Sequence, residues 1–349
     1  MAVLLASGLA GRAAARQVDR PPAPPLFASH EPVPFTITTD IGALRGDRRE
    51  SPDRPAVFTL PALGEAGPAA ETRDVPGEVR TRGSFRLDPA NCSFPPLRID
   101  VDGDDAEGTV LEGQDDLKLV ASCRPGRASY DELVVLEYLT YRTYAIVTDA
   151  SFRTRWIELT LVDSRGEAED ATRPGFLIEE DDALAERLGA RVFELEEERN
   201  LPAWGLDPTT MMMTAVFQYM VGNADWSDVA GHNVELLERG GAALVVPYDF
   251  DFTGVVDAPY AVPPEGLGLR SVRERVYRGW CASPIVTAAV LDRFRAAEGE
   301  VMTLWRDAGG LEDDTRRRVI SYLEVFFGDI QNDERAERAF LRDCRRQEG

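Results

Sequence analysis

The sequence has few residues that bind metals and no long apolar segment. It contains two histidines and four cysteines, and no two cysteines stand at C-x-x-C spacing, which argues against a structural zinc site. No run of about 18 apolar residues occurs, so we expect no transmembrane segment. The net charge of −22 argues against a nucleic-acid partner, because a phosphate backbone would be repelled.

Lysine is the scarcest of the charged residues. Lys118, in the stretch GQDDLKLVASC, is the single lysine among 39 lysine and arginine residues. Chance in an arginine-rich composition is one explanation. The other is chemistry that needs a compact ammonium, which the planar guanidinium of arginine cannot replace. The surroundings of Lys118 must decide between the two.

Residues 1–30 look like a secretory leader, with a short apolar run, an alanine-rich stretch and a proline-rich spacer. We therefore expect an exported protein, periplasmic or extracellular, with a disordered cytoplasmic tail as the alternative. The even number of cysteines agrees with export. Because each pair shares a region of the chain, we expect the bridges Cys92–Cys123 and Cys281–Cys344, with four free thiols as the alternative.

The rest of the chain divides into a β-rich part and a mainly helical part. Residues 31–175 contain short alternating stretches separated by glycine, proline and aspartate, which predict strands. Residues 176–349 contain longer helical patterns such as MMMTAVFQYMV. Within the β-rich part, Ser129 and Glu132 form a capping box that predicts one helix starting at Tyr130. The sequence therefore predicts an α+β fold.

Glu137 lies in the middle of the apolar stripe of that predicted helix. A buried carboxylate is costly unless a cation meets it. Arg98 and Lys118 are the nearest basic residues on predicted strands, so we expect one of them to be its partner. A strand lysine paired with a helix glutamate positions nucleotide phosphates in protein kinases, and a structural salt bridge is the alternative.

The most informative segment is 211–254. It predicts an apolar helix, a polar loop, a β-hairpin that turns at Arg239-Gly240-Gly241, and an Asp-Phe-Asp triplet. Its candidate functional residues are Asp225, Asp228, Asn233, Asp249 and Asp251. Phosphoryl transfer needs one aspartate for the proton of the nucleophile, and an asparagine and a second aspartate to hold magnesium. Ordinary turn chemistry is the alternative.

These segments resemble the CotH family of atypical, kinase-like proteins, first known from spore coats. The resemblance covers about half of the chain and rests on RTRGSF (80–85), FPPLRID (94–100) with DLKLVAS (116–122), TRPGFLIEE (172–180), NADWS (223–227) with Asn233, and PYDFDFTG (247–254). It implies a bilobal kinase-like fold that binds ATP with Mg²⁺ or Mn²⁺. It also implies transfer of phosphate to hydroxyl groups of a protein substrate.

The resemblance also implies roles for single residues. Asp225 would be the catalytic aspartate, and the metal ligands would be Asn233 and Asp249, with Asp251 close by. The nucleotide would be contacted by Lys118, Glu137, Arg98, Arg82 and Glu179. Of these, Lys118 and Glu137 would form the phosphate-positioning pair.

Two departures from the kinase pattern keep alternatives open. Seven residues separate Asp225 from Asn233, whereas kinases have four, and Asp228 meets that shorter spacing and competes for the catalytic role. The glycine-rich phosphate loop G-x-G-x-x-G does not occur, so Arg82-Gly83-Ser84 must take its place.

Two other functions remain as alternatives. An exported protein meets little ATP, which favours a kinase-fold envelope protein that binds or assembles without catalysis. A D-x-D glycosyltransferase would use Asp249 and Asp251 to hold the metal ion of a nucleotide sugar. It would need a strand-rich nucleotide domain upstream of the motif, where the sequence predicts an apolar helix and a hairpin.

Overall fold

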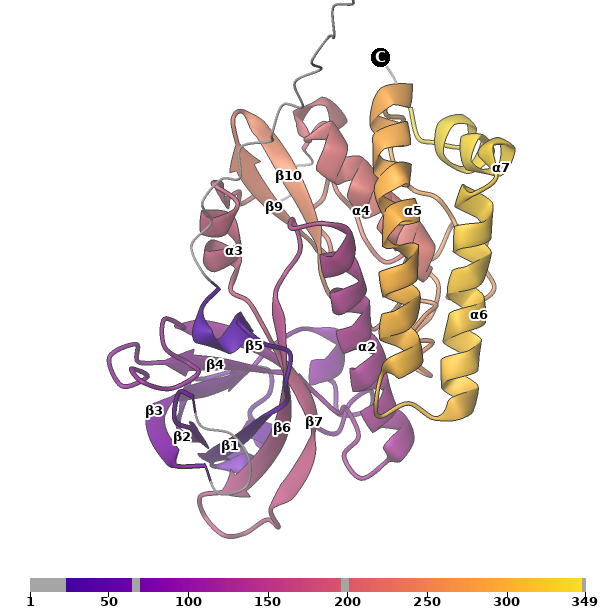
Figure 1. Cartoon of the computed structure of the whole chain (residues 1–349). Helices are drawn as coiled ribbons and strands as arrows, with labels where there is room; N and C mark the ends of the chain where they lie inside the picture. The colour runs from indigo at the N-terminus through magenta and orange to yellow at the C-terminus, as the bar shows by residue number, and fades with distance from the viewer. Residues whose placement is uncertain (1–22, 65–69, 196–200, 347–349) are drawn as a thin grey trace, which may run out of the picture.

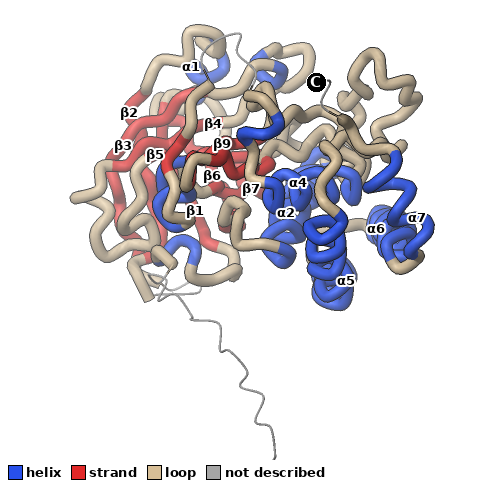
Figure 2. The backbone as a smooth tube through the Cα atoms, turned by 90° about the horizontal axis from the view of Figure 1, so that it is seen from above, coloured by secondary structure: helices blue, strands red, loops and turns tan. Residues whose placement is uncertain are grey.

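A computed structural model describes residues 23–64, 70–195 and 201–346. The protein is a mixed α+β molecule in which a strand-rich N-terminal part lies beside a helical C-terminal part (Figure 1). Seen from above, the strands gather on one side and the long helices on the other (Figure 2). The predicted α+β fold is confirmed at this level. Residues 1–22, which form most of the predicted leader, lie outside the described residues.

Strands of the N-terminal part close into a barrel in the order β1-β2-β3-β4-β5-β7-β6. Neighbouring strands are antiparallel except β1 and β6, which run parallel and close the ring. The strands are β1 (Val33–Thr39), β2 (Arg54–Pro61), β3 (Thr72–Thr81), β4 (Leu97–Val101), β5 (Asp116–Ala121), β6 (Thr154–Asp163) and β7 (Ala171–Ile178). Closing a sheet into a ring removes free strand edges.

The barrel interior is filled by apolar side chains that alternate with outward-facing ones along the strands. In β1, Phe35 and Ile37 are buried while Pro34 is exposed, which is the period of two expected of a strand. Phe35 packs against Phe58 of β2, with ring centroids 5.8 Å apart. The predicted β-rich character follows from the same alternation.

The remaining elements are helices and one small sheet. The helices are α1 (Ile41–Gly46), α2 (Ala128–Val147), α3 (Asp181–Arg187), α4 (Pro208–Val221), α5 (Pro284–Asp307), α6 (Asp313–Ile330) and α7 (Asp333–Glu337). The small antiparallel sheet consists of β8 (Arg191–Val192), β9 (Val234–Arg239) and β10 (Ala242–Pro247). Short turns of 3₁₀ or π type are η1 (Pro25–Phe27), η2 (Phe85–Leu87), η3 (Ala203–Gly205) and η4 (Arg338–Arg342).

Helix α2 lies between the barrel and the other long helices (Figure 1). It begins at Ala128, before the predicted start at Tyr130, and no side chain caps it. The predicted capping box of Ser129 and Glu132 is therefore wrong. The carboxylate of Glu132 instead accepts a hydrogen bond from the backbone N–H of Glu312 at 2.7 Å, which ties α2 to the start of α6.

Helix α4 carries the chain to the predicted catalytic loop. Asp207 caps its start by accepting the backbone N–H of Thr210 at 2.8 Å. Gly222 ends it in the left-handed conformation at φ 70°, where an added Cβ would meet the hydroxyl oxygen of Tyr322 at 2.1 Å. Only glycine fits there, and the turn that it makes starts the loop that carries Asp225.

Two disulfides connect the predicted pairs, Cys92–Cys123 and Cys281–Cys344. Both predictions are confirmed, and disulfides persist in oxidising compartments, which agrees with the expected export. Within the parts of the chain that the structure describes, no helix combines the length and apolar character needed to cross a membrane.

Candidate functional site

The hairpin of β9 and β10 brings two distant predicted site residues together. Asn233 directly precedes β9, and Asp249 follows β10 with only Tyr248 between. Because the strands are antiparallel and Val234 pairs with Pro247, both ends lie at the same edge of the hairpin. The backbone N–H of Tyr248 donates to the carbonyl oxygen of Asn233 at 3.1 Å. The predicted hairpin is confirmed, and it joins the polar loop to the Asp-Phe-Asp triplet.

Both of these residues have left-handed backbone conformations, with φ 52° at Asn233 and φ 59° at Asp249. Such a conformation costs a non-glycine residue about 1–3 kcal/mol and is concentrated at functional sites. At Asp249 the backbone is fixed by a hydrogen bond, since its N–H donates to the hydroxyl oxygen of Tyr141 at 2.8 Å. The strain at both ends of one hairpin marks this edge as a candidate site.

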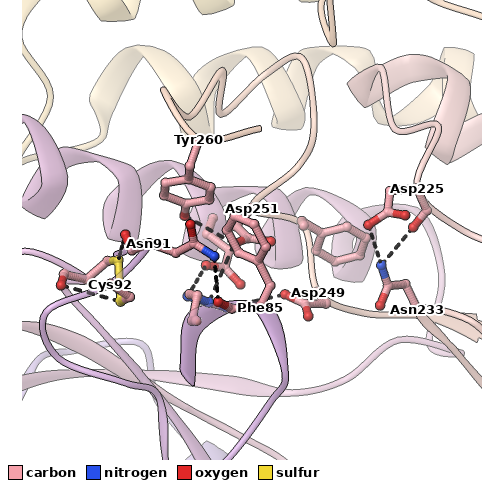
Figure 3. A network of polar contacts seen from close by, with 12 residues as sticks. Phe85, Asn91, Cys92, Asp225, Asn233, Asp249, Asp251 and Tyr260 are labelled. Carbon is pink, nitrogen blue, oxygen red and sulfur yellow. Dashed lines mark hydrogen bonds and ion pairs between the residues drawn. A yellow bond between two sulfur atoms is a disulfide. The ribbon is translucent and has the colours of Figure 1, made fainter. Parts of the chain in front are cut away.

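Asp225 lies against Asn233 at this edge (Figure 3). The side-chain amide of Asn233 donates to the backbone oxygen of Asp225 at 2.7 Å and to its carboxylate at 3.2 Å. The other carboxylate oxygen contacts Nε2 of His232 at 3.0 Å, and this hydrogen bond raises the pKa of His232. The carboxylate is partly exposed, so it is both oriented and accessible. His232, next to Asn233 in the sequence, was not predicted as a site residue.

Asp228, the competing aspartate, has different surroundings. It is fully buried, and burial raises its pKa. One carboxylate oxygen accepts the backbone N–H of Val229 at 2.9 Å and lies 3.7 Å from the guanidinium of Arg345, near the C-terminus. Asp228 therefore does not share the edge at which Asp225 and Asn233 meet.

The carboxylates of Glu137, Asp249 and Asp251 surround one guanidinium, that of Arg86. Nη1 lies 3.9 Å from Glu137, Nη2 lies 3.4 Å from Asp249, and Nε lies 3.5 Å from Asp251. Arg86, Glu137 and Asp251 are all buried. In addition, the hydroxyl of Tyr260 donates to Asp251 at 3.1 Å. We call the four charged residues Arg86, Glu137, Asp249 and Asp251 the Arg86 cluster.

Burial shifts two pKa values in the Arg86 cluster. Burial, opposed by Arg86, raises the pKa of Glu137 to about 8 and that of Asp251 to about 7. Nearby carboxylates add to both shifts, because like charges disfavour ionisation. Arg82, predicted to contact phosphate, lies close by: burial lowers its pKa and the charge of Asp249 opposes that shift.

The predicted pair of Lys118 and Glu137 is wrong. The ammonium of Lys118 instead donates to both carboxylate oxygens of Asp181, at 2.6 and 2.8 Å. It lies 5.1 Å from the ring centroid of Tyr248. Glu137 does have the cationic partner that its burial requires, but Arg86 supplies it from a loop, and the prediction considered only basic residues on strands.

Arg98 and Glu179, both predicted to contact the nucleotide, also have partners inside the protein. Arg98 forms an ion pair with Asp116 on the neighbouring strand. The buried carboxylate of Glu179 accepts two hydrogen bonds from Arg187, both at 2.8 Å, and one from the backbone N–H of Arg153 at 3.1 Å. Neither residue contacts the Arg86 cluster, and Glu179 holds the segment between β7 and α3 in place.

The donor atoms at the hairpin edge suit magnesium only in part. Among the described residues, no group of three or more histidine, cysteine, aspartate or glutamate side chains is placed to hold a metal ion. Magnesium does not require such a cage, because one or two carboxylates together with substrate phosphates are sufficient. Of the predicted ligands, Asn233 and Asp249 lie at this edge, and the carboxylate of Asp251 contacts Arg86 and Tyr260.

The chain matches no protein-family model, and no curated protein is similar to it in sequence. The resemblance to CotH-type kinases therefore rests on the quoted motifs and their order along the chain. The structure adds one observation to these motifs, which is that Asp225, Asn233 and Asp249 lie together at one edge of a hairpin.

Proposed function

We propose that this protein is a CotH-like atypical kinase, which uses ATP and Mg²⁺ to transfer phosphate to hydroxyl groups of a protein. The observation that carries the proposal is the convergence of Asp225, Asn233 and Asp249, which come from two segments joined by one hairpin. Phosphoryl transfer depends on positioning and electrostatic stabilisation, and needs a proton acceptor beside oxygen ligands for the metal.

In this proposal Asp225 accepts the proton of the substrate hydroxyl. Its carboxylate is held by His232 and Asn233 and is partly exposed, so a hydroxyl group can approach it. Asp228 is buried against the C-terminal segment, and we assign it a structural role. Magnesium, when bound with the nucleotide, would neutralise negative charge on the phosphates.

The barrel and the helical part would be the two lobes of a bilobal kinase-like fold, with the nucleotide between them. Lys118 extends from β5 of the barrel towards α3 and the ring of Tyr248, next to Asp249. Its ammonium would bind a phosphate, and Arg82 would contribute a second positive charge. Both disulfides support export to the periplasm or the cell exterior.

A second candidate is a kinase-fold binding or assembly protein without catalysis. The specific observation in its favour is that two positive charges of the site, Lys118 and Arg86, are already engaged. Asp181 binds Lys118, and three carboxylates surround Arg86. In an active kinase, nucleotide phosphates must compete with these internal partners.

Transfer of labelled γ-phosphate from ATP to a panel of protein substrates tests the proposal. We expect transfer by the wild type in the presence of Mg²⁺ and none after chelation. Asp228→Asn is the matched control for Asp225→Asn, because only Asp225 contacts Asn233. Magnesium-dependent ATP binding without any transfer would favour the binding protein, and the absence of ATP binding would reject the kinase.

A further inference from the structure

Arg86 has an unusual set of partners for a buried arginine. Three carboxylates lie 3.4–3.9 Å from its three guanidinium nitrogens, and none forms a close two-bond pair with it. A guanidinium paired with one carboxylate normally forms two parallel hydrogen bonds of about 2.7–2.9 Å. Arg86 instead lies among the carboxylates as their shared counter-ion.

The guanidinium of Arg86 lies where the three carboxylates meet. Glu137, Asp249 and Asp251 each face a different one of its nitrogens, and the carboxylates of Asp249 and Asp251 also lie close enough to interact with each other. This agrees with the lack of a preformed metal-binding group among the described residues. Magnesium needs ligands at about 2.0–2.1 Å, so these oxygens can meet one ion only after the guanidinium has moved out.

The position of Arg86 in the chain makes such a movement feasible. It lies in the short turn η2, three residues after Gly83, which has φ 87°. Beside it, the ring of Phe85 meets edge-on that of Phe252, the residue after the Asp-Phe-Asp triplet, with centroids 5.2 Å apart. The same loop carries Arg82, so phosphates bound there would offer a displaced guanidinium a new anionic partner.

We propose that Arg86 occupies the cation position of the metal site in the nucleotide-free protein, and that a divalent cation must displace it. The proposal rests on the proposed function, since the displacing cation is the one bound with ATP. Metal ion and guanidinium compete for the carboxylates of Asp249 and Asp251. Metal affinity is therefore low without nucleotide, and rises when phosphates hold the displaced arginine.

Binding of Mn²⁺ alone to the full chain, measured by calorimetry, tests this competition without any turnover. Arg86→Gln should bind Mn²⁺ about tenfold more tightly than the wild type, because the site no longer has to be vacated. Loss of one positive charge also strengthens cation binding by simple electrostatics. Arg82→Gln is the matched control, since Arg82 lies near Asp249 but forms no ion pair with the cluster, and it should give a clearly smaller gain.

A second comparison guards against misfolding of Arg86→Gln, which leaves three carboxylates without their counter-ion. Arg86→Gln/Glu137→Gln keeps the formal charge of the wild-type cluster, so it should bind Mn²⁺ more tightly than the wild type because the guanidinium is gone and not because the charge has changed. Equal or weaker Mn²⁺ binding by the proteins that lack Arg86 overturns the proposal, as does an equal gain in Arg82→Gln. Stabilisation of the wild type by ATP and Mg²⁺ is measured separately and shows whether the proposed function survives.

Discussion

Two positive charges face carboxylates in the candidate site, and they are held in different ways. Lys118 has one partner, Asp181, with both oxygens within hydrogen-bonding distance at 2.6 and 2.8 Å. Arg86 is shared by three carboxylates at 3.4–3.9 Å. At the Lys118 end one cation binds one carboxylate, and the neighbouring Glu235 is a partly buried carboxyl whose pKa is raised to about 7. At the Arg86 end three carboxylates share one cation. There burial raises the pKa values of Glu137 and Asp251, and the neighbouring carboxylates add to both shifts.

This difference indicates which end is suited to a metal ion. Buried carboxylates without enough positive charge are destabilising, and they take up protons or bind cations to relieve the excess. The Arg86 end also contains Asp249, which the sequence predicts as a metal ligand. If the proposed function is right, the metal ion would therefore bind at the Arg86 end and a phosphate at the Lys118 end.

The substitution with the largest expected effect on phosphoryl transfer lies at neither end. It is at Asp225 on the hairpin edge, the proposed proton acceptor. Asp225→Asn should lower the rate of phosphoryl transfer by about 10²–10⁴-fold, the usual contribution of a general base, and leave nucleotide affinity nearly unchanged. Single-turnover kinetics with labelled ATP measure this. Asp228→Asn should keep most of the activity, and the reverse result would move the catalytic role to Asp228.

The raised pKa values at the Arg86 end should make stability depend on pH. Glu137 and Asp251 have raised pKa values in the folded protein. Near neutral pH the folded protein therefore holds protons that the unfolded chain has released. The free energy of unfolding should therefore fall by on the order of 2 kcal/mol as pH rises from about 5 to about 8. Urea unfolding with the disulfides intact measures this decrease.

Glu137→Gln should flatten that pH dependence. Glu132→Gln, on the same helix but outside the cluster, should keep it. Burial also raises the pKa of Glu235, to about 7. Its contribution to the pH dependence is the same in each of these proteins. Equal slopes for Glu137→Gln and the wild type would mean that Glu137 does not have a raised pKa in the folded protein.

The smallest effect that we predict concerns the Lys118 end. Lys118 lies between Asp181 and the rings of Phe152 and Tyr248, a site that fits a compact ammonium better than a wider guanidinium. Lys118→Arg should weaken nucleotide binding about tenfold, or ~1.4 kcal/mol, as measured by calorimetry. Affinity equal to that of the wild type would leave chance as the explanation of the lone lysine.

Double-mutant cycles test whether the two ends are independent. Lys118→Arg and Glu137→Gln should have additive effects on nucleotide affinity, within about 0.5 kcal/mol, because the residues are not in contact. Lys118→Arg and Asp181→Asn should not be additive, because they form one ion pair. Coupling between Lys118 and Glu137 would restore the original kinase-like pair.

Local sequence patterns predicted much of the fold. The alternation in the first part and the helical periodicity in the second gave the α+β order, and the hairpin before Asp249 follows from its glycine turn. Closure of the barrel was not predictable, because it depends on β1 pairing with β6, which lies more than a hundred residues along the chain. The capping box of Ser129 and Glu132 does not form, and Glu132 instead bonds to a distant helix, which no local pattern shows.

The candidate site was predictable where its residues are close in sequence. Asn233 and Asp249 meet because one short hairpin joins them, and Asp225 lies in the loop just before it. The pairing of Glu137 was not predictable, because the burial of the carboxylate demands a cation but does not say which one. Arg86 and Asp181 are reached only through the tertiary fold, and neither was among the predicted site residues.

The most direct test of the account is thermal unfolding with ATP, in the presence and absence of Mg²⁺. A ligand that binds only the folded protein adds about 2.7 kcal/mol of stability at a hundredfold excess over its Kd. We predict such stabilisation for the wild type only when Mg²⁺ is present, its loss in Asp249→Asn, and a smaller decrease in Asp251→Asn. Stabilisation by ATP that needs no Mg²⁺, or that survives in Asp249→Asn, would contradict the assignment of the metal ion to this site.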